Sequence, residues 1–104
     1  MDRKQIVQNA TKIIHEKSPD AKVILYGSEA RGTSTGNSDI DLLILINKDK
    51  ISLVDKQNIS YPLFDLGFET GVIISPLIMT RYDWENRPIK TPFYINVLND
   101  GIEL

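Results

Sequence analysis

The chain has 104 residues, no cysteine and a formal net charge of −2, with 41% hydrophobic and 25% charged residues. These values are ordinary for one globular domain, so we expect residues 1–104 to form a single domain, and they argue against disordered and fibrous classes. The absence of cysteine excludes disulfides, thiolate metal ligands and cysteine nucleophiles.

The sequence also argues against membranes and, more weakly, against nucleic acid. No apolar run approaches the roughly 20 residues of a membrane span, and the N-terminus lacks the apolar stretch of a secretory signal. We therefore expect a cytoplasmic protein with no membrane partner. A slightly acidic chain offers no general attraction for nucleic acid, which leaves only a local basic patch for such an acceptor.

The first third of the chain predicts a helix, a strand and the start of a second helix. From Asp2 to Lys17 apolar residues recur at helical spacing, and Ser18-Pro19 ends the pattern. His15 in this helix is read as a solvated or helix-end residue. The apolar run Val23–Tyr26 predicts a buried strand, and Ser28–Arg31 resembles the first turn of a helix with a serine cap.

The middle of the chain predicts a loop, two further strands and a helix between them. Residues 32–38 are almost all glycine, serine, threonine and asparagine, which indicates a loop, and residues 41–46 read as a second buried strand. Residues 50–66 suggest a helix in which Pro62 causes a kink or begins a new helix. The β-branched run Thr70–Ile74 predicts a third strand, with Pro76 at its end or at a sheet edge.

The last quarter predicts a short capped turn over residues 80–85 and a terminal helix. Thr91-Pro92 supplies an N-cap and a first-turn proline, and Gly101 closes the helix. Its apolar side is expected to carry Phe93, Val97 and Leu98. Aromatic residues in this region are read as core or as a partner surface (Trp84, Phe93, Tyr94). Together the elements predict a mixed α/β fold, with a mixed β-sheet flanked by helices.

The segment Gly27-Ser28 has the chemistry of a phosphate-binding turn. Glycine allows backbone N–H groups to approach an anion, and the start of a helix adds unpaired donors. The Ser28 hydroxyl can donate to a phosphate oxygen, while Arg31 could reach the phosphates or brace the following loop. Taken alone, however, a Gly-Ser pair after a strand is also explained as a simple turn with a helix cap.

Asp39 and Asp41 have the spacing of a magnesium platform. Residues two apart on a strand point to the same face, about 7 Å apart, while Ile40 turns into the core. Magnesium commonly takes one or two protein carboxylates and completes its shell with water and phosphates. A turn residue followed by a solvated one would also explain Asp-x-Asp, but Asp41 precedes five aliphatic residues, where an unanswered carboxylate is costly.

Specificity comes from the combination of both halves. Seven positions with these residues at this fixed spacing would recur by chance in about one window in 10⁸. Gly27-Ser28-x-x-Arg31-Gly32 followed by Ser38-Asp39-Ile40-Asp41 resembles the signature of the DNA polymerase beta type nucleotidyltransferase superfamily. The short chain resembles its minimal (MNT) branch, and the likeness covers residues from about 4 to 80.

The resemblance implies a fold, cofactors and site residues. It implies a Mg²⁺-dependent enzyme that binds a nucleoside triphosphate, here expected to be ATP, and transfers AMP to an acceptor hydroxyl. Gly27, Ser28, Arg31 and Ser38 would contact the nucleotide, and two Mg²⁺ ions would be held by the aspartates. A third carboxylate normally completes the site from a later strand. Glu69 is the candidate, although it also reads as an ordinary acidic residue between helix and strand.

Two other functions stay open. Minimal members of this family resemble antitoxins that pair with a helical HEPN-type protein, in some cases adding AMP to it, and a chain without a visible acceptor-binding domain invites such a partner. The alternative is thus an antitoxin or regulatory partner that binds nucleotide without efficient catalysis. A degenerate domain without nucleotide binding is the third hypothesis, which the missing aspartate favours and the Asp39–Asp41 pair opposes.

Overall fold

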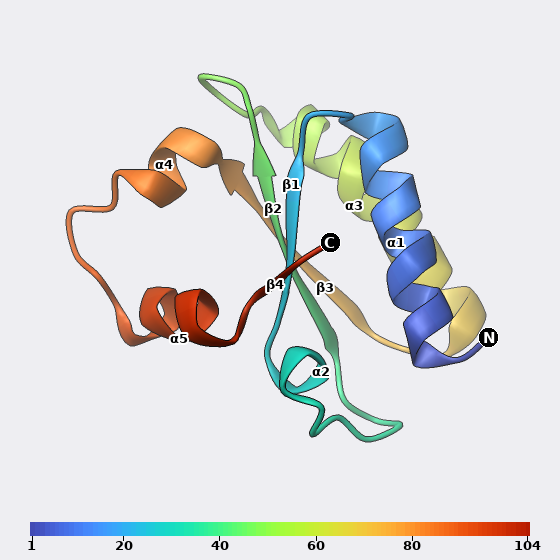
Figure 1. Cartoon of the computed structure of the whole chain (residues 1–104). Coiled ribbons are helices and arrows are strands. Elements are labelled where there is room, and N and C mark those ends of the chain that lie inside the picture. Colours follow the sequence, from blue (N-terminus) through green and yellow to red (C-terminus); the bar gives the residue numbers. More distant parts are fainter.

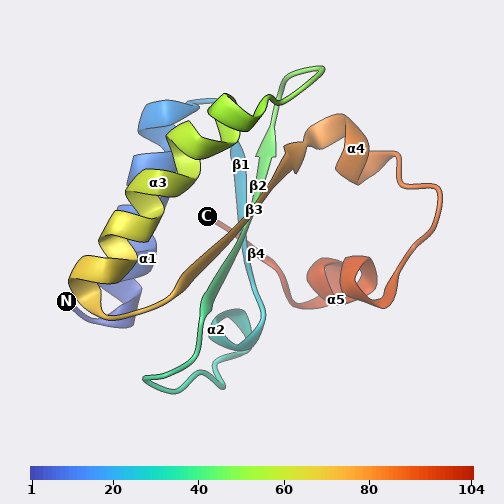
Figure 2. The same cartoon turned by 180° about the vertical axis from the view of Figure 1, so that it is seen from behind.

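A mixed four-stranded sheet forms the centre of the computed structural model, which describes all residues from Met1 to Leu104 (Figures 1 and 2). Its strands are β1 (Lys22–Tyr26), β2 (Ile40–Ile46), β3 (Ile74–Thr80) and β4 (Ile102–Glu103), in the order β3-β2-β1-β4. β2 runs parallel to β3, whereas β1 is antiparallel to both β2 and β4. The predicted mixed sheet is confirmed.

Two long helices cover one face of this sheet (Figure 1). They are α1 (Arg3–Lys17), capped by Asp2, and α3 (Leu53–Thr70), capped by Ser52. α3 connects two parallel strands, a connection that needs a crossover helix. Their apolar sides and one face of the sheet form a core cluster of 16 buried residues. No helix combines the length and apolarity needed to cross a membrane.

The terminal quarter of the chain covers the opposite face (Figure 1). It contains α4 (Arg81–Glu85) and α5 (Pro92–Asp100), with Trp84 and Val97 packed against Leu43 and Leu45 of β2. The ring centroid of Trp84 lies 4.7 Å from that of Tyr94 and 6.2 Å from that of Phe93. These aromatic residues therefore belong to a second core. Leu98, expected on the apolar side, is instead 60% exposed.

Burial on both faces explains the continuous apolar run of β2. Ile40, Leu42 and Ile44 face the large core, while Leu43 and Leu45 face the second one. A strand covered on both sides has no need of polar alternation. Asp41 is the exception, and by alternation it lies on the face that carries Leu43.

One prediction for the middle of the chain was wrong. Thr70–Ile74 is not a strand, because α3 continues to Thr70, Gly71 caps it in the left-handed conformation (φ 73°), and β3 begins only at Ile74. Pro62 lies inside α3 and does not begin a new helix, which was one of its two predicted alternatives. The buried residues Ile59, Leu63 and Leu66 on both sides of the proline anchor the helix to the core, which outweighs the local cost. Pro76 lies within β3, an edge strand, as one of the two alternatives predicted.

Candidate active site

The predicted site residues gather at one end of the sheet. There β1 ends, β2 begins and β3 begins, and the short helix α2 (Ser28–Arg31) extends beyond the strands together with the loop that follows it (Figure 2). Tyr26 pairs with Asp41 across β1 and β2, and Asp41 pairs with Ser75 across β2 and β3. The topology thus places the Gly-Ser turn and the aspartate pair side by side.

Gly27 is required at its position for two independent reasons. Its φ is 75°, in the left-handed region that side chains avoid, and an added Cβ would lie 2.5 Å from Asp41 Oδ2. Gly27, and not Ser28, stands at the N-cap of α2, so the predicted serine cap was wrong. No hydrogen bond within the protein occupies the Ser28 hydroxyl, which leaves it available to a ligand.

The negative charge of Asp39 acts on Asp41, and Arg31 does not fully compensate it. Burial raises the pKa of Asp41 above its ordinary value, and the negative charge of Asp39 raises it further, while the positive charge of Arg31 lowers it. The net shift is upward, so Arg31 does not offset burial and Asp39. A half-buried carboxylate whose charge is disfavoured by a neighbouring carboxylate is a suitable environment for a cation.

Ser75 of β3 lies beside the two aspartates. It is the residue of β3 in register with Asp41, and its hydroxyl donates a hydrogen bond of 3.3 Å to Asp39 Oδ2. Ser75 was not predicted from the sequence, because the predicted third strand began four residues too early. With a strand that begins at Ile74, Ser75 stands out as a polar residue among mostly apolar ones.

Glu69 does not complete the site. It is an exposed residue of the last turn of α3, since the strand that would have aligned it with the site does not exist. No group of three histidine, aspartate or glutamate side chains is close enough to hold a metal ion. The expected third carboxylate is therefore not supplied by Glu69, and Ser75 occupies the strand position beside Asp41.

The other predicted nucleotide contacts have partners inside the protein. The Ser38 hydroxyl accepts a hydrogen bond of 2.9 Å from the Thr35 backbone N–H and so closes a turn in the loop. Arg31 Nη1 lies 3.7 Å from Asp100 Oδ2, at the end of α5. Of the two roles considered for Arg31, bracing the loop is not seen. Its positive charge nevertheless lowers the pKa of Asp41.

Tyr26 is the last residue of β1 and pairs with Asp41 across the sheet. Burial, and the negative charge of Asp41, raise its pKa above the ordinary value of 10.0, so the phenol stays protonated at neutral pH. Its ring meets Phe93 edge to face, with centroids 5.4 Å apart. The strand end that carries the site is thereby tied to α5.

Comparisons with known proteins find a matching family and similar chains. The sequence model of the family described as "Nucleotidyltransferase domain" matches residues 7–101. Two proteins of Methanocaldococcus jannaschii, each named "Putative protein adenylyltransferase", are 34% identical over 101 residues and 36% identical over 83 residues. These alignments cover 97% and 77% of this chain, and 93% and 73% of the relatives.

Two solved structures share the fold. A chain of a toxin–antitoxin complex crystallised with AMP-PNP has a TM-score of 0.64 and 18% identity, over 98% of this chain and 72% of that one. A protein of Sulfolobus solfataricus described as a putative nucleotidyltransferase has a TM-score of 0.62 and 14% identity, over 95% and 76%. The matches include α4 and α5, which the sequence motif alone did not reach.

Proposed function

This chain belongs to the family of nucleotidyltransferase domains, and on that premise we propose that it transfers AMP from ATP to a hydroxyl group of a protein, with Mg²⁺ as cofactor. The observation that carries the proposal is the half-buried Asp41 carboxylate, held against Gly27 beside Asp39 with its pKa raised. The names of the two relatives support a protein acceptor. The chain's net charge of −2 gives no support to a nucleic acid acceptor.

The residues have separate roles in this reaction. The backbone at Gly27 and the free Ser28 hydroxyl contact the triphosphate, while Arg31 adds positive charge next to the aspartates. Asp39, Asp41 and the Ser75 hydroxyl offer the oxygen ligands that Mg²⁺ prefers, and phosphates and water supply the remainder. Bound Mg²⁺ would stabilise the charge on the entering and leaving oxygens.

The transfer itself exchanges one phosphorus–oxygen bond for another. The acceptor oxygen bonds to the α-phosphorus, the bond from the α-phosphorus to the bridging oxygen breaks, and pyrophosphate leaves. The acceptor's proton must be removed as its oxygen attacks. Ser75 cannot act as a carboxylate base, so in this proposal the charges of Asp39 and Asp41 favour that loss. We therefore expect firm nucleotide binding and slow transfer.

Label transfer from ATP tests this function. The protein is incubated with Mg²⁺, ATP labelled at the α-phosphate and its candidate acceptor protein, and protein-bound label is counted. The wild type and a control carrying Asp20→Asn and Asp49→Asn, both exposed away from the site, should label the acceptor. Asp39→Asn with Asp41→Asn should not. Equal labelling by all three proteins would overturn the assignment.

The second candidate function, a nucleotide-binding antitoxin or regulatory partner of a HEPN-type helical protein, is favoured by the outer face of α3. Tyr61, Phe64 and Phe68 lie along this face and are 56%, 49% and 91% exposed. An apolar groove of about 380 Å³ continues from Phe68 to Ile73. Apolar patches of this kind mark protein interaction sites, and one structural neighbour comes from a toxin–antitoxin complex.

Co-expression with the candidate helical protein tests the partner. Mass measurement during size-exclusion chromatography should give a complex, and Phe68→Ser should weaken it. A complex without label transfer would identify a regulatory partner rather than an acceptor. If the two proteins elute separately at micromolar concentration, this second function fails while the first is unaffected.

A further inference from the structure

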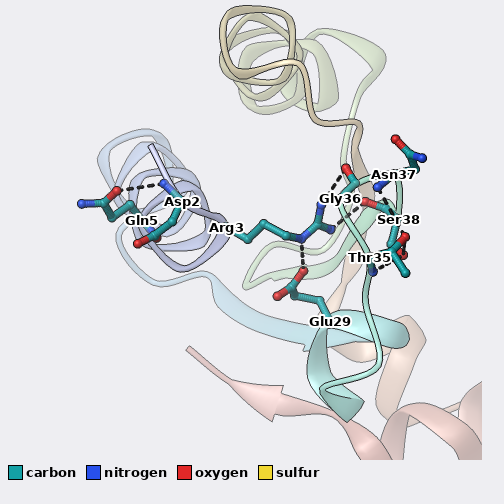
Figure 3. A network of polar contacts seen from close by, with 8 residues as sticks. All are labelled: Asp2, Arg3, Gln5, Glu29, Thr35, Gly36, Asn37 and Ser38. Carbon is teal, nitrogen blue, oxygen red and sulfur yellow. Dashed lines mark hydrogen bonds and ion pairs between the residues drawn. The ribbon is translucent and has the colours of Figure 1, made fainter.

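Arg3, in the first turn of α1, joins three segments that are distant in the sequence (Figure 3). Its Nε lies 2.6 Å from Glu29 Oε1, its Nη2 donates a hydrogen bond of 2.6 Å to the Ser38 carbonyl, and its Nη1 donates a longer one of 3.5 Å to the Gly36 carbonyl. The ion pair is mostly shielded, since the Arg3 and Glu29 side chains are only 19% and 17% exposed. The planar guanidinium fork is suited to holding several acceptors in a fixed geometry.

Arg3 provides the main long-range anchor for the loop before Asp39. The other hydrogen bonds of this loop are local, such as Thr33 N–H to the Ser28 carbonyl (3.0 Å) and Ser38 N–H to the Thr35 carbonyl (3.1 Å). A loop of glycine, serine and threonine has many accessible conformations. The anchored carbonyl belongs to the residue just before Asp39, so Arg3 limits where that carboxylate can lie.

Arg3 also controls charge next to the Gly-Ser turn. Glu29 follows Ser28 in α2, so an unpaired carboxylate there would repel an approaching triphosphate and add to the charge of Asp39 and Asp41. The ion pair turns the Glu29 carboxylate toward α1 and offsets its charge. A partly buried, hydrogen-bonded pair of this kind is screened far less than the chain's exposed ion pairs.

We propose that Arg3 is a positioning residue of the nucleotide site, which fixes the loop before Asp39 and neutralises Glu29 beside Ser28. The proposal rests on the proposed function, because it assigns Arg3 to the same nucleotide site. Arg3 itself contacts neither of the aspartates. It acts through the Ser38 carbonyl and the Glu29 carboxylate.

Two measurements on one set of variants test this role. The set is wild type, Arg3→Ala, Arg3→Lys, Glu29→Gln, the double variant of Arg3→Ala with Glu29→Gln, and Arg81→Ala as a control that breaks an exposed pair on α4. Calorimetry gives the Kd of AMP-PNP in Mg²⁺, and amide hydrogen exchange reports on residues 33–39. Thermal unfolding verifies that each variant is folded.

Each contribution of Arg3 has its own expected result. Arg3→Ala should raise the Kd about tenfold, as expected for loss of charge-assisted hydrogen bonds, and should speed exchange in the loop. Removing Glu29 as well should restore part of the affinity but not the slow exchange. Arg3→Lys should keep more of the affinity than Arg3→Ala, since it keeps the charge, but should lose the fork that holds Ser38. Arg81→Ala should have the same Kd and the same loop exchange as the wild type.

The outcomes separate this proposal from the proposed function. If the wild type binds AMP-PNP and Arg3→Ala changes only the melting temperature, Arg3 is merely a structural ion pair and the proposal is overturned. The same holds if adding Glu29→Gln to Arg3→Ala restores no affinity and if Arg3→Ala leaves the loop exchange unchanged. If the wild type does not bind AMP-PNP at all, the proposed function fails, and the role of Arg3 at a nucleotide site fails with it.

Discussion

Gly27 is constrained both by its left-handed backbone conformation and by its close approach to Asp41. Gly27→Ala would force a side chain into the left-handed region and against Asp41 Oδ2. A strained backbone position costs about 1–3 kcal/mol, so we expect the free energy of unfolding to fall by about that amount and nucleotide binding to be lost. Urea unfolding measures the first effect.

Gly36→Ala is the matched control for Gly27→Ala. Gly36 lies in the neighbouring loop, without a positive φ and with nothing within 4 Å of an added Cβ. It should leave stability nearly unchanged. Equal effects of the two substitutions would mean that the approach of Gly27 to Asp41 is not what requires glycine.

Asp41 should make the metal-free protein less stable at neutral pH. Its pKa is raised above the ordinary 3.8 by burial and by Asp39, so the folded state holds the proton more tightly than the unfolded chain. The contribution of Asp41 to the free energy of unfolding is therefore fully present below about pH 3.8. It is lost as the pH rises through the pKa that Asp41 has in the folded protein. Asp41→Asn should therefore raise the melting temperature at pH 7 in EDTA, and the difference should shrink toward pH 3.8.

Mg²⁺ and an exposed aspartate provide the controls for this pH dependence. Adding Mg²⁺ with nucleotide should stabilise the wild type and not Asp41→Asn. Asp20→Asn, on an exposed turn, should follow the wild type at every pH. A lower melting temperature for Asp41→Asn than for the wild type at pH 7 in EDTA would contradict the account of a destabilising carboxylate.

Candidate site residues that lie close together along the chain could be predicted from the sequence, whereas contacts between residues that are distant in the sequence could not. Gly27, Asp39 and Asp41 fall within one short segment, where spacing and turn chemistry carry the information. Arg3 contacts Glu29 across 26 positions and Ser38 across 35. Nothing in the spacing of these residues marks them as neighbours, because the packing of α1 against the sheet creates the contact.

At the scale of elements, α3 shows how tertiary packing overrides local propensity. Pro62 cannot donate the hydrogen bond that the Asn58 carbonyl would accept, yet the helix runs unbroken from Leu53 to Thr70. Pro62→Ala should restore this bond and raise the free energy of unfolding by about 1 kcal/mol or more, up to about 3 kcal/mol. Urea unfolding measures it, and a lower stability would show that the helix is adapted to the proline.

The same helix has a buried face, which contributes to stability, and an exposed face, which does not. Leu63 is fully buried, so Leu63→Ala should cost about 2–5 kcal/mol. Phe68, 91% exposed on the outer face, contributes little to the fold, and Phe68→Ser should change stability by less than about 0.5 kcal/mol. Guanidinium unfolding compares the two. A large loss in Phe68→Ser would show that its ring is buried in the free protein.

The helix and strand types were largely predictable, whereas one boundary was not. The cap of α5 at Thr91 and the apolar run of β2 can be recognised in the local sequence. The β-branched residues after Gly71 suggested a strand, but Gly71 caps the helix and pairing with β2 begins only at Ile74. The parallel register decides that boundary, and register is a property of the assembled sheet. Because of this single shift, the prediction placed Glu69 rather than Ser75 at the strand position beside the aspartates.

At the scale of the whole molecule, the terminal segment completes the fold and borders the site. After α5 the chain forms β4, which extends the sheet beside β1. β4 was not predicted from the sequence. The Arg31–Asp100 and Tyr26–Phe93 contacts connect α5 to the end of the sheet where the aspartates lie. The sheet therefore carries the candidate site on the face that α5 covers, and the apolar outer surface of α3 on the other.

Calorimetry with AMP-PNP shows whether Gly27 to Asp41 forms a Mg²⁺-dependent nucleotide site. The titration is run in Mg²⁺ and in EDTA on the wild type, on Asp39→Asn with Asp41→Asn, and on the control Asp20→Asn with Asp49→Asn. We predict saturable binding in Mg²⁺ by the wild type and the control, and none by the wild type in EDTA or by the Asp39/Asp41 variant. Equal heats from the wild type and the Asp39/Asp41 variant in Mg²⁺ would contradict the account.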